Sequence, residues 1–154
     1  ASQFDLSHPV SPEIFQLVEA IDPLRNKQLT TGLRQLGEEG AIQVFRPEGG
    51  GSLLLGAVGM LQMEVVVHRL EHEYGAQARL VPSRYQVARW VSSDDAAELK
   101  RFFRLNAHRI AYDAVDAPTI LLANKAELRA VEENWPAIRF HAMREHGGLL
   151  REAA

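Results

Sequence analysis

The sequence contains no cysteine, no long hydrophobic run and no excess of positive charge. Without cysteine, the chain cannot form disulfides, use a thiol nucleophile or bind zinc through thiolates. No stretch of about 18 apolar residues is present, and the N-terminus lacks the basic start and apolar stretch of a signal peptide. The net charge of −3 excludes the global positive field of a protein that coats nucleic acid, so neither DNA nor a membrane is expected as a partner. A soluble, cytoplasmic protein is predicted.

What is present is the composition of a folded chain. The 154 residues are 46% hydrophobic and 24% charged, which is close to the average for soluble globular domains. This length suits one domain of ordinary size or two small ones packed together. The first residue is Ala1 rather than methionine, which indicates processing or a fragment of a longer chain.

The first half of the chain has the pattern strand, helix, strand, strand, helix, strand. Residues 1–12 show no sustained period and are predicted to be a linker or tail. Asp22 caps the first helix, Gly40 ends it, and a glycine-rich loop at 47–51 separates two short apolar runs. We expect strands at 13–21, 41–46, 52–58 and 76–81, and helices at 22–39 and 59–75. This order is the split βαβ arrangement of ferredoxin-like folds.

The second half has the same order with unrelated residues. Ser93 is the expected cap of its first helix, and Asn124 with Glu127 forms a capping-box pattern for its second. We expect strands at 85–91, 110–113, 119–123 and 138–141, and helices at 94–108 and 125–135. Each half has about 60 to 70 residues and would be marginal alone. The predicted fold class is therefore α+β, with two βαββαβ (ferredoxin-like) halves, 13–83 and 84–146, packed into one compact unit and followed by a tail at 147–154.

One short motif resembles a catalytic zinc site. His68, Glu71 and His72 follow the H-x-x-E-H order, in which two helical histidines hold zinc and the glutamate acts as base. The motif falls on the polar face of its helix together with Glu64, and no third ligand is identifiable by spacing. We expect a solvated helix face here and no metal ligand, and we keep a small zinc metallohydrolase as an alternative function.

A second motif resembles part of a nucleotide-binding site. Asn124-Lys125-Ala126-Glu127 is similar to the guanine-recognition sequence of GTPases, but the phosphate loop G-x-x-x-x-G-K-[ST] is absent. The glycines at 49–51 precede a strand rather than a helix N-terminus, so they do not form a phosphate cradle. We predict no catalytic residue, no nucleotide-binding residue and no cofactor for this chain.

The residues best suited to contact a partner are basic or lie at a strand end. Arginines can position RNA phosphates. One cluster is formed by Arg104 together with Lys100, Arg101 and Arg109, which lie close to it in the sequence. The predicted partner-contact residues are Arg79, Arg84, Arg89, Arg104, His141, Arg144 and His146. A third function remains open, a ferredoxin-like ligand-sensing module, which requires an apolar pocket between the halves.

Several separated strings resemble the same protein family. The run GAVGMLQMEVVVHRL at 56–70 resembles a segment of translational GTPases related to elongation factor G. DPLRNKQL at 22–29, LGEEGAIQVFRP at 36–47 and ARWV at 88–91 are similar to the C-terminal domain of the bacterial peptide-chain release factor three family. The resemblance covers about 12–146 and includes no GTP-binding domain.

The resemblance implies a parent GTPase in translation termination. Such a protein uses GTP or GDP with Mg, bound outside this chain, to promote dissociation of stop-codon-reading release factors from the ribosome. Within it, this domain is expected to contact the ribosome, through RNA or a ribosomal protein, as well as its own GTPase domain and possibly the release factors. The isolated chain is expected to be non-catalytic.

Overall fold

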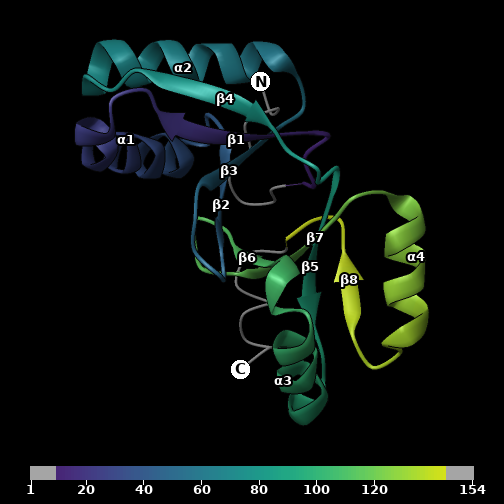
Figure 1. Cartoon of the computed structure of the whole chain (residues 1–154). Coiled ribbons are helices and arrows are strands. Elements are labelled where there is room, and N and C mark those ends of the chain that lie inside the picture. Colours follow the sequence, from purple (N-terminus) through teal and green to yellow (C-terminus); the bar gives the residue numbers. More distant parts are fainter. Residues whose placement is uncertain (1–9, 145–154) are drawn as a thin grey trace.

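The computed structural model describes residues 10–144 and has the predicted α+β class. Its strands form one eight-stranded sheet with helices packed against it (Figure 1). In chain order the elements are β1 (Ile14–Ala20), η2 (Pro23–Arg25), α1 (Asn26–Glu39), β2 (Gln43–Pro47), β3 (Leu53–Ala57), α2 (Met60–Tyr74), β4 (Ala78–Pro82), β5 (Val87–Ser92), α3 (Ala96–Leu105), η3 (Ala107–Arg109), β6 (Ile110–Tyr112), β7 (Pro118–Leu122), α4 (Lys125–Asn134) and β8 (Arg139–His141). In residues 10–144, no helix is long and apolar enough to cross a membrane.

The sheet consists of two units with the same strand order. The full order is β4-β1-β3-β2-β6-β7-β5-β8. The first four strands, which we call the first unit (14–82), lie in the order 4-1-3-2. When the strands of the second unit (87–141) are numbered from its own first strand and read from β8 inward, their order is also 4-1-3-2. Both units therefore have the ferredoxin-like topology that the sequence predicts.

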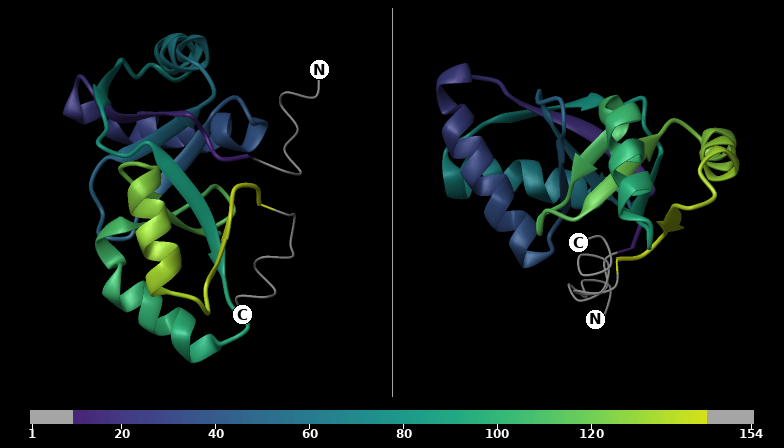
Figure 2. Two further views of the ribbon diagram at one scale, coloured as in Figure 1. Left: turned by 90° about the vertical axis from the view of Figure 1, so that its right-hand side faces the viewer. Right: turned by 90° about the horizontal axis from the view of Figure 1, so that it is seen from below.

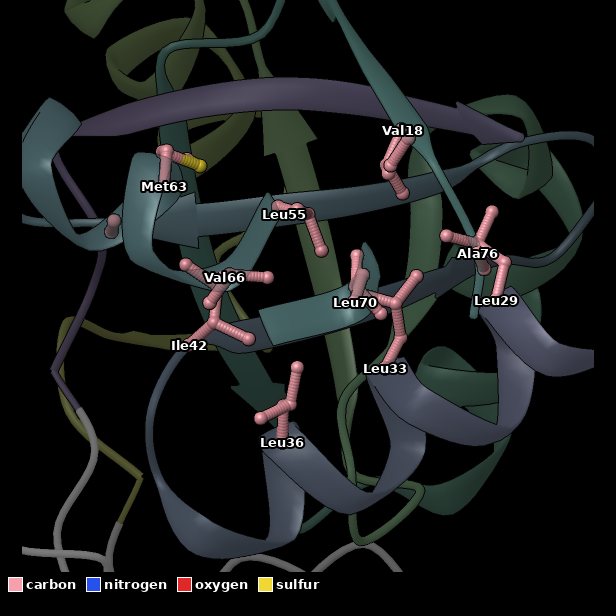
Figure 3. Packing of buried hydrophobic residues seen from close by; sticks show 12 residues of the cluster. Val18, Leu29, Leu33, Leu36, Ile42, Leu55, Met63, Val66, Leu70 and Ala76 are labelled. Carbon is pink, nitrogen blue, oxygen red and sulfur yellow. The ribbon is translucent and has the colours of Figure 1, made fainter. Parts of the chain in front are cut away.

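In each unit the helices cover one face of the sheet. Alternate residues of a strand point to opposite faces, so Val18 of β1 joins the core beneath α1 and α2, whereas Phe15 points away from it. Figure 3 shows Leu33 of α1 and Leu70 of α2 meeting over Leu55 of β3, and all three side chains are fully buried. The helices α3 and α4 cover the second unit in the same way, over a core that includes Phe102 and Ile120.

The two units share a sheet and also pack face to face. Strands β2 and β6 pair antiparallel, with Arg46 opposite Tyr112. The helix-free faces of both units meet in a third buried cluster, which combines Phe15, Phe45 and Leu54 of the first unit with Ala88, Ala111 and Leu121 of the second. The halves therefore pack together as predicted, and in addition they are joined through backbone hydrogen bonds. Figure 2 shows the two units from two further directions.

Residues 10–13, which we call the strap, lie across both units. Pro12 is buried against Gly56 of β3, and Ser11 donates a backbone hydrogen bond to Ala142 (2.7 Å) and a hydroxyl hydrogen bond to Ala88 (2.8 Å). Val10 forms an antiparallel bridge with Met143. The sequence predicts a linker up to residue 12, whereas Val10–Pro12 is an ordered part of the fold.

The helix ends mostly follow the sequence signals. The Asp22 carboxylate accepts from the Leu24 amide (3.0 Å), although the first turn is a 3-10 turn rather than α-helix. The predicted cap at Ser93 is wrong, because the Asp95 carboxylate accepts from the Glu98 amide (3.0 Å) and caps α3. Ser93 donates instead to Ala137 (2.7 Å) and accepts from the Asp95 amide (3.0 Å). Ser93 thus shapes the turn before the helix.

Candidate functional site

Of the seven predicted partner-contact residues, His146 lies outside the described residues. The other six fall into three separate places. Arg79 lies alone on β4, the edge strand of the first unit, where its Nε is 3.7 Å from a carboxylate oxygen of Glu19. The other five lie in the second unit or next to it.

Arg89, His141 and Arg144 lie around the strap. The Arg89 guanidinium donates to the Ala88 carbonyl (2.9 Å) and to the Ser11 hydroxyl (3.3 Å). His141 pairs with Trp90 in the sheet, and its Nε2 lies 2.9 Å from the Ser92 hydroxyl. These contacts occur within the chain, so they connect β5, β8 and the strap to one another.

Arg144 is engaged in a buried network. Its Nε lies 2.9 Å from the Asp113 carboxylate, and the two side chains are only 13% and 8% exposed. The contact is an ion pair without an aligned hydrogen bond, since the Arg144 Nε has no hydrogen-bond partner. Asp113 also accepts from the Trp90 indole (3.0 Å) and the Ala117 amide (2.8 Å). This network fixes the chain after β8 on the second unit.

Arg84 and Arg104 belong to a basic surface at one end of the second unit. Arg84 is in the β4–β5 connection, Arg104 is in the last turn of α3, and both are exposed. Lys100 is one turn before Arg104, His108 lies in η3, and Lys125 is the first residue of α4. We define the basic surface by Arg84, Lys100, Arg104, His108 and Lys125.

Contacts between side chains hold this end together. The Arg84 guanidinium lies 4.9 Å from the centre of the Tyr85 ring and donates to its hydroxyl (3.0 Å). That hydroxyl donates to the His108 carbonyl (3.4 Å), which ties the β4–β5 connection to η3. Arg109 joins the start of α4 through Glu127 (3.3 Å). The hydrogen bond that Arg84 donates to the Tyr85 hydroxyl raises the pKa of Arg84, so the guanidinium stays charged.

The basic surface is distinguished by cations that have no carboxylate partner. Most arginines of the described region lie within 4.0 Å of an acidic oxygen, including Arg101 with Glu98 and Arg109 with Glu127. In residues 10–144, exposed lysines and arginines without such a partner are Arg25, Lys27, Arg84, Lys100, Arg104, Lys125 and Arg129. Five of these seven lie in the second unit or its connection to the first, and four of the five form the basic surface.

Lys125 and His108 are absent from the sequence-based candidates. The side-chain oxygen of Asn124 accepts a hydrogen bond from the backbone amide of Glu127 (2.9 Å), which confirms the predicted helix cap. The capping box is not closed, because the Glu127 carboxylate pairs with Arg109. The sequence does carry one signal that points to Lys125. It is a lysine at the first position of a predicted helix, where the positive end of the helix dipole disfavours a cation.

The zinc motif lies on an open surface of the first unit. His68, Glu71 and His72 are exposed on α2, with the two imidazole rings 4.2 Å apart. In the described part of the chain, no group of three His, Cys, Asp or Glu side chains is arranged to hold a metal ion. A catalytic zinc needs three protein ligands and a sheltered open position. The geometry gives no support to the metallohydrolase alternative.

The space between the units is filled by side chains. Phe45 and Leu54 of the first unit and Leu121 of the second are all buried in the shared cluster. A shallow depression lies elsewhere, between α1 and α2, lined by Lys27, Gln28, Thr31 and Tyr74. A ligand-sensing module would need an apolar pocket with convergent polar groups at the junction. The filled junction removes the basis for that alternative.

Comparison with known proteins identifies the family. Residues 8–132 match the family model described as "Class II release factor RF3, C-terminal domain". The chain is 65% identical over 144 residues to Peptide chain release factor 3 of Nitrosomonas europaea, covering 94% of this chain and 27% of that protein. It is 66% identical to the same-named protein of Nitrosomonas eutropha, with the same coverage, and 63% identical over 141 residues to that of Bordetella avium, covering 91% of this chain and 26% of the relative. The chain thus spans about a quarter of the length of the curated relatives it matches, and it belongs to the release factor 3 family, in the region of its C-terminal domain.

Proposed function

We propose that this chain is the ribosome-contacting domain of a translation-termination GTPase that promotes dissociation of stop-codon-reading release factors from the ribosome. The observation that carries the proposal is the 65% identity to a peptide chain release factor over 94% of the chain. The proposed partners are the ribosome, the GTPase domain of the same protein and the release factors themselves.

The joined architecture supports a role as a rigid body. A domain that passes on a nucleotide-dependent change must bind differently in the two states, because only a difference in affinity can shift a conformational equilibrium. The β2–β6 pairing, the shared cluster and the strap hold the two units in one arrangement. In this role the domain would move as one piece relative to the GTPase domain.

A chimera tests the proposal. Residues 10–144 would replace the matching region of the Nitrosomonas europaea relative, and GTP-dependent dissociation of a stop-codon-reading release factor from termination complexes would be measured. We expect activity close to that of the unmodified relative, and none when the region is deleted. A folded chimera that hydrolyses GTP but releases no factor would contradict the proposal.

The proposal also assigns nucleotide chemistry to the parent protein. The isolated chain is expected neither to bind nor to hydrolyse GTP, and GTP, GDP and Mg are proposed as cofactors of the GTPase domain alone. Titration calorimetry of the chain with GTP checks this directly. Binding at a one-to-one ratio would contradict the division of roles.

A further inference from the structure

We propose that the basic surface binds the phosphate backbone of RNA. The inference rests on the proposed function, in which the domain contacts the ribosome, and it names the component contacted and the face that makes the contact. It starts from the uneven distribution of free positive charge in a chain whose net charge is −3. Arg84, Lys100, Arg104 and Lys125 have no carboxylate within 4.0 Å.

Stability does not account for the cation at the start of α4. A lysine in the first turn of a helix is disfavoured, because the unpaired amides there carry partial positive charge. Lys125 occupies that position, and Asn124 already supplies the cap. A residue that departs from a local preference without an internal partner is better explained by an external one.

The fold gathers these cations at one end of the second unit. Lys100 and Arg104 are one helical turn apart, so their side chains lie about 5–6 Å apart at Cβ on one face of α3. The pair Arg109–Glu127 (3.3 Å) brings the end of α3 and η3 to the start of α4. Figure 1 shows α3 beside β5 and α4 beside β8, with the β4–β5 connection entering the second unit at the same end as the start of α4. The contacts Tyr85–His108 and Arg109–Glu127 thus bring the β4–β5 connection, the end of α3 and the start of α4, which carry these cations, to one end of the second unit.

The chemistry of the surface favours phosphate over a protein partner. The Tyr85 ring and hydroxyl hold the Arg84 guanidinium in place, and an ordered guanidinium can donate two parallel hydrogen bonds to a phosphate. A stable protein interface needs buried apolar anchors. Several exposed apolar side chains lie around the start of α2 in the first unit, whereas α3 and α4 together expose one large apolar side chain, Leu105.

The experiment measures binding of the chain to a short fluorescein-labelled RNA duplex by anisotropy, and to purified ribosomes by co-sedimentation, at salt concentrations from about 50 to 200 mM. The test variant is Arg84→Gln/Arg104→Gln. The matched control is Arg25→Gln/Lys27→Gln, which removes two exposed unpaired cations from the first unit. Circular dichroism confirms that both variants are folded.

We expect the test variant to lower the slope of log affinity against log salt by about two, since each phosphate contact contributes about one. Binding to the RNA and to the ribosome should both weaken, by about tenfold at the lower salt concentration. The control should behave like the original chain in both measurements.

Three results would overturn the inference. The first is equal loss in both variants, which would indicate general electrostatic attraction. The second is no effect of the test variant, in which case ribosome binding by the unmodified chain would leave the proposed function standing. The third is loss of ribosome binding with unchanged RNA binding, which would indicate a ribosomal protein. If the chain instead binds RNA through this surface but does not sediment with ribosomes, the proposed function fails and the RNA surface remains.

Discussion

Asp113 shows how one side chain can order the region after the last strand. Its carboxylate is 8% exposed and is shared by Arg144, the Trp90 indole and the Ala117 amide. A carboxylate in such a position is satisfied only while all of these groups are present, because a buried charge without a partner is costly. The same residue therefore fixes both the turn after β6 and the chain after β8.

We predict that Asp113→Ala lowers the free energy of unfolding by about 3–5 kcal/mol, since it leaves the Arg144 charge buried and unpaired. Urea unfolding followed by tryptophan fluorescence measures the change. Asp94→Ala is the control, because Asp94 is 87% exposed in its pair with Arg139 and its loss should leave stability nearly unchanged. A similar loss in both variants would show that the network adds nothing beyond a surface ion pair.

At the scale of elements, the packing of α1 on α2 depends on a glycine. A Cβ built on Gly32 of α1 would lie 2.8 Å from Leu70 Cδ2 and 2.8 Å from Tyr74 Cγ of α2. Neither of these atoms is the free end of a flexible surface side chain, and Leu70 is fully buried. The two helices approach this closely because the position has no side chain.

We predict that Gly32→Ala is destabilising, against the usual direction for a glycine inside a helix. Helix propensity alone would stabilise by up to about 1 kcal/mol, but overpacking costs about 1–3 kcal/mol. A net loss of about 1–2 kcal/mol in thermal or urea unfolding is expected. Thr30→Ala, at an exposed position of the same helix, should leave stability unchanged or slightly raised. A stabilised Gly32→Ala variant would show that α1 and α2 can separate without cost.

The β2–β6 junction should respond to alkaline pH. Burial, and then the nearby Glu48 carboxylate, raise the pKa of Tyr112 to about 12, against about 10 in an unfolded chain. The folded protein thus retains a proton that the unfolded chain has lost, so this contribution to stability is complete below about pH 10 and disappears as pH rises through about 12.

We predict that the free energy of unfolding falls between about pH 10 and 12, and that Tyr112→Phe removes this part of the decline. Urea unfolding at stepped pH values measures both slopes. Identical slopes in the two proteins would mean that Tyr112 does not link the junction to pH.

The sequence predicts most elements because their signals are local. The short apolar runs that form β2 and β3, the helix spacing of Leu29, Leu33 and Leu36, and the glycines that end α1 and α2 are signals contained within a few residues. The pairing of β2 with β6 depends on contacts between residues about 65 apart, as with Arg46 and Tyr112, and no local pattern encodes it. The basic surface is only partly predictable. Arg84 and Arg104 are predicted from the sequence as arginines, whereas their position at the same end of the unit as Lys125 depends on contacts between elements, such as Tyr85 with His108 and Arg109 with Glu127.

At the scale of the whole molecule, the two units should unfold together. Each buries a core of its own, but Phe45 of the first unit is fully buried in the cluster shared with the second. Both tryptophans, Trp90 and Trp135, lie in the second unit. Their fluorescence therefore reports on the unit that does not contain Phe45.

We predict that Phe45→Ala lowers stability by about 3–5 kcal/mol and shifts the unfolding midpoints from tryptophan fluorescence and from far-ultraviolet circular dichroism by the same amount. Leu61→Ala, at a side chain 72% exposed, should shift neither midpoint. A change in circular dichroism without one in fluorescence would mean that the units unfold independently.

The strap has a mechanical consequence for any force that reaches the domain through residue 10. Its hydrogen bonds go to different parts of the molecule. Ser11 donates to Ala88 and Ala142 of the second unit and the segment after it. In the first unit, the Gln43 side-chain amide donates to the Val10 carbonyl (2.6 Å), and the Glu13 backbone amide donates to the Ala57 carbonyl (3.0 Å). Because these bonds reach both units, a force on the strap is passed to both units at once. Torque applied to the strap would therefore turn both units as one body.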